Sequence, residues 1–593
     1  MTVKDLKSPG NQERGCHMSY RGLQDFIHKL EERGELIRIG SIVSPLLEMT
    51  EIADRVCKAE AFGNKALLFE HVDGSPYPVL MNAFGTDSRM ALSLGAESLD
   101  HIGEDIESYL DFKNYSSLFK LVSFAPRLFR LLCCFPVRRR FHFFRPSCQQ
   151  VIEREPDLGK LPVLQCWPLD GGRFLTLPLV FTKYPDTKLQ NMGMYRMQVL
   201  DSSTTAMHWQ KHKDGAGIYE AYRKKGCPMP VSVALGCDPA ITYASTAPLP
   251  PKLDEMMLAG FLRKWPVKMV KCITNDLYVP EDAEFVLEGY VDPEEELVWE
   301  GPFGDHTGYY SLADWYPRFH VTTITRKRKP VYPATVVGKP PMEDCYMAKA
   351  TVRIFLPLLK MMIPELRDIH LPFEGVFHNC AVVSVKQAYP GAARTVMNAI
   401  WGLGQMRTAK MIVAVDETID PCDTAAVWKE ILAYADPKED FVVSKGPLDA
   451  LDHSSDFPLY GGRLGIDATR RGKEPFSDGA LEIVPVRKKK AWDGRQKALA
   501  LLKEKGASLI LVVDEDVDPA DHSTVMWRVF NNIDVTRDMF TEGRRAAFDA
   551  TRKRPEEGLS RPWPEDIVMT DEIRKKVSEK WRTYGINSPK NRK

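Results

Sequence analysis

The feature that most constrains the fold is a segment that occurs twice near the end of the chain. MIVAVDETIDPCD, residues 411–423, matches LILVVDEDVDPAD, residues 509–521, and the later motifs GIDATRR and AFDATRK also correspond. Apolar strands that alternate with helices are typical of an α/β unit with a parallel sheet. A second copy of such a unit indicates internal duplication. We therefore expect a C-terminal α/β oligomerisation domain at 338–475 and an appended duplicate with a tail at 476–593.

The acidic residues that end each repeated strand leave two interpretations open. Carboxylates grouped at a strand end can bind a hard cation. The same pattern also fits a duplicated packing and subunit-contact module, because a repeated fold does not imply a repeated function. Both interpretations stand at the level of the sequence.

Residues 18–160 are predicted to form an N-terminal α/β domain. Leu23, Phe26, Ile27 and Leu30 recur at helical spacing, and Gly34 can end that helix. The runs ALLFEHV and YPVLMNAF follow, joined by a Gly-Ser-Pro turn, and they predict a hairpin.

An insertion at 118–145 alternates Phe and Leu with Lys and Arg, unlike the rest of the chain. A basic, apolar stretch can lie on an anionic membrane surface, which would make the protein peripherally membrane-associated. Alternatively, its apolar side packs on the neighbouring domain while the arginines remain in water.

Between 161 and 337 the chain has many short β-branched runs, such as VSVALG and FHVTTITR, broken by Gly, Pro and Asp. Helices are predicted only at GIYEAYRKK and KLDEMMLAGFLRK. The expected fold class is therefore α/β in the broad sense, a multidomain α+β chain with a β-rich domain at its centre.

Composition excludes several classes of protein. Lys plus Arg and Asp plus Glu both number 80, so no net charge favours nucleic acid as a partner. The 12 cysteines show no CxxC pairs, which argues against a zinc module or a disulfide framework and favours the reducing cytoplasm. We expect a cytoplasmic chain without a signal peptide or membrane span, because the first 17 residues are polar and no run of about 18 apolar residues follows.

Polar side chains concentrate in three places of the central region. The first is QNMGMYRMQVLD, where Asn191 offers an amide oxygen to a cation and Arg196 a planar fork to a carboxylate or phosphate. Five residues apart, the two would face opposite sides of a strand unless a bend intervenes. A satisfied buried pair is the alternative.

The second place is WEGPFGDHTGYY, where glycines and a proline surround Glu300 and Asp305. Such a turn can hold a carboxylate against a ligand, and two carboxylates near an arginine suit proton transfer. Ordinary turn chemistry, with Asp305 capping the loop, is the alternative.

The third place is Glu255, which has apolar neighbours on a predicted helix and is either a surface residue or a buried ligand. His208 and His212, four residues apart, could both reach a metal only if MHWQKHK were helical. The preceding MQV predicts strand or loop instead.

These motifs carry a resemblance to a known family. NMGMYR, MHWQKHK, VSVALGCDPA, VKCITNDLYVPEDAEFVLEGY, EGPFGDHTGYY and GKPPMED stand in the order typical of the UbiD decarboxylases, and the chain resembles them from about Tyr20 to Asp467. The resemblance implies a central split β-barrel at 161–337 that binds prenylated FMN. It also implies a divalent cation, usually manganese (Mn2+), and a potassium ion (K+) at the cofactor phosphate.

The resemblance assigns roles to individual residues. It implies that Arg196, Glu300 and Asp305 are catalytic, with Asp305 as the proton donor. Asn191 and Glu255 resemble manganese ligands, and His212 is the nearest candidate for the third, with Lys213 and Asp214 as alternatives. The residues that resemble the cofactor-contacting set are Asn191, Met194, Tyr195, Arg196, His208, Trp209, Gln210, Lys213 and Glu255.

Length and the extra C-terminal unit make the chain most similar to the long family members assigned to menaquinone biosynthesis, whose substrate is a prenylated or free 1,4-dihydroxy-6-naphthoate. The resemblance implies a flavin prenyltransferase as cofactor supplier and assembly as a homo-oligomer, dimer or hexamer. The basic insertion would then help to extract a prenylated substrate from a bilayer.

Three rivals remain. One is another enzyme of the family, a 4-hydroxybenzoate-type decarboxylase of ubiquinone biosynthesis or a reversible catabolic arene carboxylase. Another is a non-enzymatic scaffold with a decayed site. The third, a flavin reductase, is disfavoured because no GxGxxG follows a strand in the N-terminal region.

Overall fold

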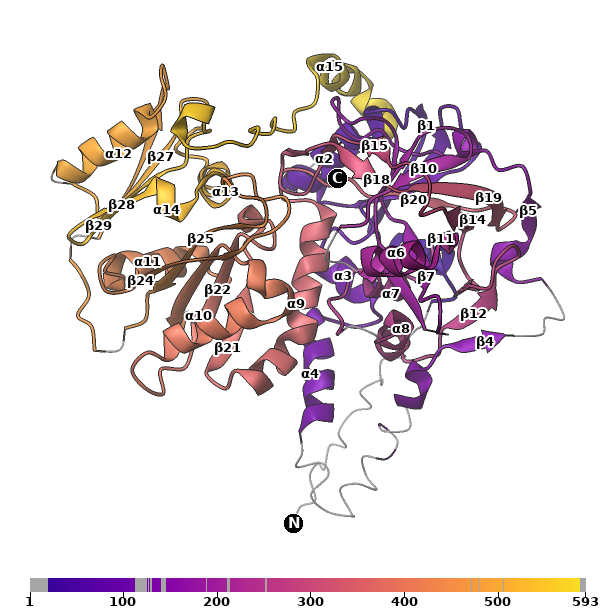
Figure 1. The fold of residues 1–593 in the computed structure, drawn as a ribbon, viewed down its shortest axis with the longest axis horizontal. Helices are drawn as coiled ribbons and strands as arrows, with labels where there is room; N and C mark the ends of the chain where they lie inside the picture. The colour runs from indigo at the N-terminus through magenta and orange to yellow at the C-terminus, as the bar shows by residue number, and fades with distance from the viewer. Residues whose placement is uncertain are drawn as a thin grey trace, which may run out of the picture.

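The computed structural model describes residues 20–586 with internal gaps (Figure 1). The gaps are 112–124, 126, 128–130, 140–144, 188, 211–213, 251–252, 471, 478 and 505. Most of the basic insertion, as well as His212 and Lys213, therefore lies outside the described residues. In Figure 1 the indigo-to-magenta part forms one body and most of the orange-to-yellow part another, with α9 (Glu343–Met362) between them. The yellow end of the chain, α15 (Asp571–Lys580), lies over the first body.

The N-terminal sheet has the order β1-β2-β3-β20, and β20 comes from much later in the chain. The predicted hairpin is confirmed, since β2 and β3 pair antiparallel. The predicted first helix is α1, and Leu23, Phe26, Ile27 and Leu30 are its buried residues. The elements are α1 (Leu23–Glu32), β1 (Leu36–Val43), α2 (Glu48–Lys58), β2 (Ala66–Val72), β3 (Val79–Met81), α3 (Asp87–Ser93), α4 (Leu99–Leu110) and β20 (Tyr332–Pro333).

The central sheet is antiparallel and open, in the order β6-β9-β10-β19-β14-β11-β7-β8, with β5 paired to β19. Both faces are covered, because Val231 and Val233 of β11 enter one apolar core whereas Ala234 enters another. The strands are β5 (Val151–Glu153), β6 (Phe174–Leu175), β7 (Leu179–Lys183), β8 (Gln190–Met194), β9 (Met197–Val199), β10 (Thr204–Met207), β11 (Met229–Leu235), β14 (Phe285–Val291) and β19 (Arg318–Arg326).

Shorter elements surround this sheet. The two helices predicted for the region are confirmed as α6 and α8, and two short hairpins, β15–β18 and β16–β17, carry the segment after Glu300. The bounds are β4 (Val137–Arg139), α6 (Asp214–Lys225), α7 (Pro239–Ala244), α8 (Glu255–Arg263), β12 (Lys268–Lys271), β13 (Tyr278–Pro280), β15 (Val298–Glu300), β16 (Phe303–Gly304), β17 (Tyr310–Ser311) and β18 (Asp314–Tyr316).

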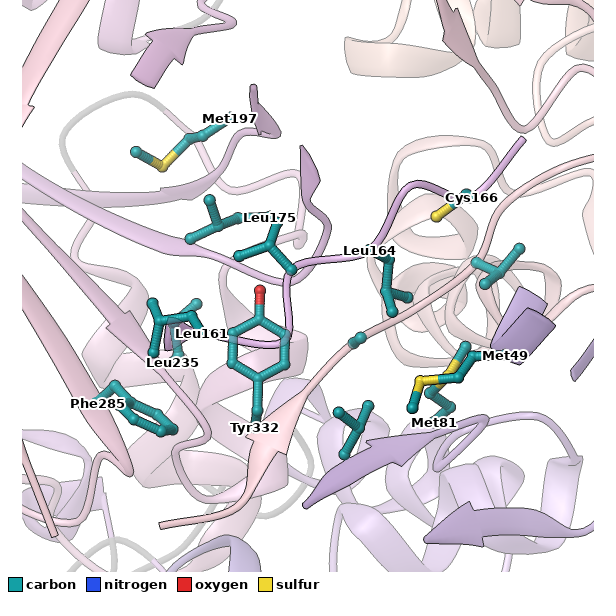
Figure 2. Close-up of a cluster of buried hydrophobic side chains, with 14 of the residues drawn as sticks. Met49, Met81, Leu161, Leu164, Cys166, Leu175, Met197, Leu235, Phe285 and Tyr332 are labelled. Atoms are coloured by element: carbon teal, nitrogen blue, oxygen red, sulfur yellow. The ribbon is translucent and has the colours of Figure 1, made fainter. Parts of the chain in front are cut away.

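The N-terminal and central sheets share one apolar core (Figure 2). In the close-up, Tyr332 of β20 lies between Met49 and Met81 of the N-terminal layer and Leu235 and Phe285 of the central sheet. Burying apolar surface on both sides of β20 fixes the two layers against each other. The central sheet is therefore a rigid platform for the residues on its strands.

The last third of the chain contains two sheets of the same design. The order is β21-β22-β23-β25-β24 in the first and β26-β27-β29-β28 in the second, and each pairs three strands in parallel before an antiparallel edge strand. The elements are β21 (Leu366–His370), β22 (Cys380–Val385), α10 (Ala392–Gly402), β23 (Met411–Asp416), α11 (Thr424–Tyr434), β24 (Phe441–Pro447), β25 (Tyr460–Asp467), β26 (Leu481–Val486), α12 (Asp493–Lys503), β27 (Leu509–Asp514), α13 (His522–Asn532), α14 (Val535–Asp538), β28 (Met539–Glu542) and β29 (Arg545–Asp549).

Equivalent faces of these two units pack against each other in a single core. Val427 of α11 and Val525 of α13 occupy corresponding positions, and both are buried in it. Asp423 and Asp521 cap α11 and α13, since they accept hydrogen bonds from the first turns of these helices. Asp416 and Asp514, which end β23 and β27, accept hydrogen bonds from the Arg470 and Arg552 amides. The mixed, multidomain α/β class predicted from the sequence is confirmed.

The chain finally returns to the N-terminal domain, where α15 (Asp571–Lys580) lies beside α2 in Figure 1. Lys576 and Lys580 form ion pairs with the buried carboxylate of Glu48, and the Tyr584 hydroxyl donates to it at 2.8 Å. Within the described part of the chain, no helix combines the length and apolar character that crossing a bilayer requires.

Candidate active site

The site begins at a break in the central sheet. Strand β8 pairs with β7 and ends at Met194, whereas β9 starts at Met197 and pairs with β6 and β10. Tyr195 and Arg196 lie in the break and belong to neither strand. This is the bend on which the orientation of Asn191 and Arg196 depends.

Arg196 joins the two predicted catalytic carboxylates. Its Nε donates to Glu300 Oε1 at 2.8 Å, its Nη2 to Glu300 Oε2 at 3.2 Å, and its Nη1 to Asp305 Oδ2 at 2.6 Å. Nη2 also donates to Ser311 Oγ at 3.0 Å, and the guanidinium carbon lies 4.5 Å from the Phe303 ring centroid. Four of the five guanidinium hydrogens are therefore engaged, which leaves one for a ligand.

Burial and charge oppose each other at these carboxylates. The side chain of Glu300 is fully buried, and that of Asp305 is 12% exposed. Burial alone would raise both pKa values, but hydrogen bonds from His208 and Arg196 lower the pKa of Glu300 to about 2. The pKa of Asp305 lies well below its usual range because His306 and the Arg196 charge outweigh burial. Both groups are carboxylates at neutral pH.

Two histidines extend this cluster. His208 Nδ1 lies 3.2 Å from Glu300 Oε2, and burial lowers the pKa of His208, so its ring is neutral. His306 Nδ1 lies 3.0 Å from Asp305 Oδ1, and its Nε2 lies 3.3 Å from Nε2 of His378 in the C-terminal domain. The cluster thus spans two domains.

Asn191 and Glu255 form a second, separate contact. Glu255 is the first residue of α8, next to the helix cap Asp254, and it accepts hydrogen bonds from Asn191 Nδ2 at 3.1 Å and the Met192 amide at 3.0 Å. Burial raises the pKa of Glu255 to about 7. Surface exposure, the base-rate alternative for Glu255, is therefore wrong, since the residue is 8% exposed.

Asn191 Oδ1 is buried and has no hydrogen-bond partner among the described residues. An orphaned amide oxygen beside a carboxylate fits a hard divalent cation, which takes oxygen ligands and would satisfy both groups. No cluster of three His, Cys, Asp or Glu side chains suited to a metal occurs in the described ranges, and His212 falls in the gap at 211–213. Asn191 and Glu255 can supply two ligands.

The other predicted cofactor residues flank the same break. Met194 ends β8, and the Tyr195 hydroxyl accepts a weak hydrogen bond from the Gly215 amide at 3.4 Å. Glu255 and Asp214 are near enough to add to the burial that raises the pKa of Tyr195 to about 12.

His208, Trp209 and Gln210 follow β10 in a loop, so the helical arrangement that would have joined His208 to His212 does not form. Trp209 Nε1 is a buried donor without a partner in the described structure, which again fits a polar ligand.

Sequence reasoning missed several residues of the site. His306 follows Asp305 directly and could have been found as a titratable neighbour, and Ser311 comes immediately after the same motif. His378 carries no local signal, because it comes from a different domain. The Tyr316 ring, 4.4 Å from the His208 ring centroid, likewise arrives through the pairing of β15 with β18.

Chemically, the arrangement holds two carboxylates ionised within reach of one arginine in a largely buried site. Glu300 and Asp305 can each accept a proton in this state, and a carboxylate that has been protonated can deliver its proton to a bound substrate. Asn191 and Glu255, which could supply oxygen ligands to a cation, lie at the other side of the same break. Together they are suited to an acidic substrate and a phosphate-bearing or metal-linked cofactor.

Comparison with protein families matches most of the chain. Three models described as domains of 3-octaprenyl-4-hydroxybenzoate carboxy-lyase, or UbiD, match: the N-terminal domain at 27–106, the Rift-related domain at 141–340, and the C-terminal domain at 345–468 and 477–559. The C-terminal model thus covers both repeated units.

Relatives match over most of their length. An uncharacterized protein of Archaeoglobus fulgidus is 49% identical over 459 residues, which are 77% of this chain and 93% of the relative. An uncharacterized protein of Helicobacter pylori strain 26695 is 36% identical over 601 residues, covering 94% of this chain and 96% of the relative.

Solved structures agree in fold. The UbiD-class enzyme HmfF from Pelotomaculum thermopropionicum, in complex with FMN, has a TM-score of 0.65 at 24% identity and covers 77% of this chain and 95% of its own. Vanillic acid decarboxylase of Sedimentibacter hydroxybenzoicus, in closed form, has a TM-score of 0.66 at 24% identity and covers 82% and 99%.

Proposed function

This chain belongs to the UbiD family of carboxy-lyases, and from that premise we propose that it removes carbon dioxide, without oxidation, from an aromatic carboxylic acid with prenylated FMN as cofactor. The observation that carries the proposal is the buried contact of Arg196 with both Glu300 and Asp305. A scaffold with a decayed site would have no reason to keep two carboxylates ionised beside an arginine, a costly arrangement without function.

Asn191 and Glu255 would hold a divalent cation, manganese in our proposal, because the orphaned Asn191 oxygen and the Glu255 carboxylate are both hard donors. His212 remains the proposed third ligand, and potassium would accompany the cofactor phosphate. When bound, prenylated FMN supplies an electron sink for the electrons left when carbon dioxide departs.

The protein's own residues would bind the acid and move the proton. Arg196 donates four of its five guanidinium hydrogens to Glu300, Asp305 and Ser311. Its main role would therefore be to keep both carboxylates charged and oriented. The remaining hydrogen can be donated to the substrate carboxylate. Asp305 would deliver a proton to the ring carbon that loses the carboxylate. A site with little water strengthens each of these contacts.

For the substrate we propose a free or prenylated 1,4-dihydroxy-6-naphthoate of menaquinone biosynthesis. Support comes from the resemblance to the long family members, because the chain carries a second C-terminal unit. A flavin prenyltransferase would supply the cofactor. A 4-hydroxybenzoate-type acid is the second substrate class to test, since the matched family models bear that name.

The test is carbon dioxide release from a panel of aromatic acids by protein loaded with prenylated FMN and manganese. Asp305→Asn should keep the cofactor, judged by its absorption and mass, yet lose turnover by roughly 100-fold or more. Asp314→Asn is the matched control, because Asp314 is an exposed carboxylate on β18. This substitution should leave turnover unchanged. Wild-type turnover by Asp305→Asn would discard the proposed acid.

A further inference from the structure

Decarboxylation consumes a proton, and the structure contains a device that could supply it. This inference rests on the proposed function: in each turnover the bond from the ring carbon to the carboxylate carbon breaks, a carbon–hydrogen bond forms, and one proton from solvent is used. Asp305 is itself a carboxylate at rest. It therefore has to receive a proton from a neighbour before it can give one.

The neighbour is His306, and the hydrogen bonds fix its protonation. Asn379 donates its Nδ2 to Asn531 Oδ1 at 2.9 Å, so Asn379 Oδ1 faces His378 Nδ1 at 3.0 Å and accepts from it. His378 then carries its proton on Nδ1 and presents a bare Nε2 to His306 Nε2, 3.3 Å away. His306 must donate there, and its Nδ1, 3.0 Å from Asp305 Oδ1, must donate to the carboxylate.

This pattern makes His306 an imidazolium at rest, held between a carboxylate and a neutral imidazole. The directions of the pKa shifts agree. Burial alone would lower both histidine pKa values, yet Asp305 raises that of His306, whereas that of His378 stays lowered. A proton on the pair therefore favours His306, the ring next to the acid.

We propose that His306 and His378 form a proton relay that shares one proton across their Nε2 atoms and reloads Asp305 in every turnover. His306 gives its Nδ1 proton to Asp305, keeps the shared proton on Nε2, and Asp305 passes its proton to the ring carbon. A turn of the His306 ring then brings its protonated nitrogen back to Asp305. His378 takes up the next proton from solvent on Nε2 and passes it to the His306 nitrogen that now faces it, which restores the His306 imidazolium.

The outer end of the relay is Asp449, whose Oδ1 lies 3.8 Å from His378 Nε2 and whose side chain is 31% exposed. Its charge attracts a proton to His378, and Asp452 acts in the same direction while Lys410 opposes it. Proton uptake would then occur from the C-terminal side, even when substrate fills the site at Asp305.

On the inner side, the groups that face His306 are Asp305, Asp344, Asp449 and His378, and the Phe377 ring stacks on it at 5.1 Å. The rival route is direct solvent access, because the His306 side chain is itself 21% exposed. The two routes make different predictions for His378.

The appended unit sets the orientation of the relay. Asn531 belongs to α13, and its Nδ2 donates to the Trp527 carbonyl at 2.8 Å, which turns its Oδ1 toward Asn379. Because Asn379 in turn fixes the tautomer of His378, a residue of the second unit positions a proton carrier of the catalytic site. Asn531 and Asn379 are positioning residues, and they touch no reacting atom.

The first test needs no substrate. Nitrogen-15 NMR of histidine-labelled apoprotein should show His306 as an imidazolium with a titration midpoint above the ordinary value of about 6.5. His378→Asn should shift that midpoint, and Asn531→Ala should change the tautomer ratio of His378. A neutral His306 at pH 7, or no response to His378→Asn, overturns the relay.

The second test uses the loaded enzyme. His378→Asn should lower kcat by roughly 10-fold or more, with the loss growing as pH rises, and added imidazole should restore part of it. Asp449→Asn keeps the acceptor for the Leu451 amide and should reproduce a smaller form of the defect. His370→Asn is the matched control, a half-buried histidine on β21 outside the relay that should leave kcat and its pH profile unchanged.

The outcomes separate the two proposals. An active wild type whose pH profile survives His378→Asn supports direct solvent access and refutes the relay. A wild type that releases no carbon dioxide from any aromatic acid refutes the proposed function, and the relay as a device of that reaction falls with it, whatever the apoprotein spectra show.

Discussion

At the scale of single residues, the arginine at the centre of the site cannot be replaced by another cation. A lysine ammonium is a compact charge with three N–H donors on one nitrogen. It cannot bridge two carboxylates with the planar geometry of the Arg196 guanidinium. We expect Arg196→Lys to lower kcat/KM by roughly 100-fold. Steady-state kinetics should place the loss mainly in kcat, whereas Arg318→Lys, at a partly exposed ion pair with Glu295, should be close to neutral.

Glu300 also ties stability to pH. Its pKa falls from 4.5 to about 2 on folding, so the ionised carboxylate stabilises the folded state by about 3 kcal/mol above pH 4.5. That contribution disappears as pH falls from 4.5 toward 2. The melting temperature of Glu300→Gln should therefore lie furthest below wild type at pH 7 and approach it near pH 3. A constant difference over this range would contradict the pairing.

Some residues of the site could be predicted from the sequence, and others could not. Asn191, Arg196, Glu255, Glu300 and Asp305 stand in recognisable motifs, and the structure joins them in two contacts. His306 and His378 were not predicted, because they are 72 residues apart in the sequence and come into contact only in the folded chain. No local sequence pattern indicates such a contact.

At the scale of elements, helix α13 of the second unit contacts the loop that carries Asp305, the proposed acid. Trp527 Nε1 donates to the Thr307 carbonyl at 2.8 Å, and the Trp527 ring stacks on Tyr309 at 5.0 Å. The Tyr309 hydroxyl donates to Asn532 Oδ1 at 2.8 Å. A helix that the sequence marks as a copy therefore helps to position the loop of the proposed acid.

Gly308 makes this close approach achievable. Its φ is +84°, and a Cβ there would lie 2.7 Å from the Trp527 ring. Gly308→Ala should displace the loop and lower kcat by about 10-fold or more. Cofactor content should be measured on the same protein, so that a loss of kcat is not confused with a loss of cofactor. Gly391→Ala controls for backbone strain, since its φ is +86° with nothing within 4 Å. Equal effects of the two substitutions would show that strain, and not the contact with α13, is responsible.

Long periodic elements were predictable, and their breaks were not. The helix at Leu23–Glu32 and the repeated strands followed from apolar spacing alone. The break at Tyr195 and Arg196 arises because β8 and β9 pair with different strands, which is a property of the whole sheet. Tertiary pairing decides such a position, so a strand pattern cannot reveal it.

At the scale of the whole molecule, the chain contains its own C-terminal partner. The two repeated units bury equivalent faces in one core, so that face is not free for another subunit. A dimer or hexamer, which the family resemblance leads us to expect, would then use another surface. The duplicated sequence predicted two units, but their packing required the structure.

Equivalence of the two faces is testable. Val427→Asp and Val525→Asp each bury an unpaired charge at corresponding positions, and both should destabilise the protein by roughly 2–5 kcal/mol, seen as a lower melting temperature. Val568→Asp, at a side chain 54% exposed, should have little effect. If Val427→Asp left the melting temperature unchanged while Val525→Asp lowered it, the result would argue against a shared core.

The central claim is that one buried site releases carbon dioxide and returns a proton to the same carbon. Isotope analysis tests it directly: the loaded enzyme is given an aromatic acid with a carbon-13 carboxyl group in deuterium oxide. We predict labelled carbon dioxide and a product with one deuterium at the carbon that lost the carboxylate, both strongly reduced in Asp305→Asn. Labelled carbon dioxide with an oxidised or deuterium-free product, or equal amounts from Asp305→Asn, would contradict the account.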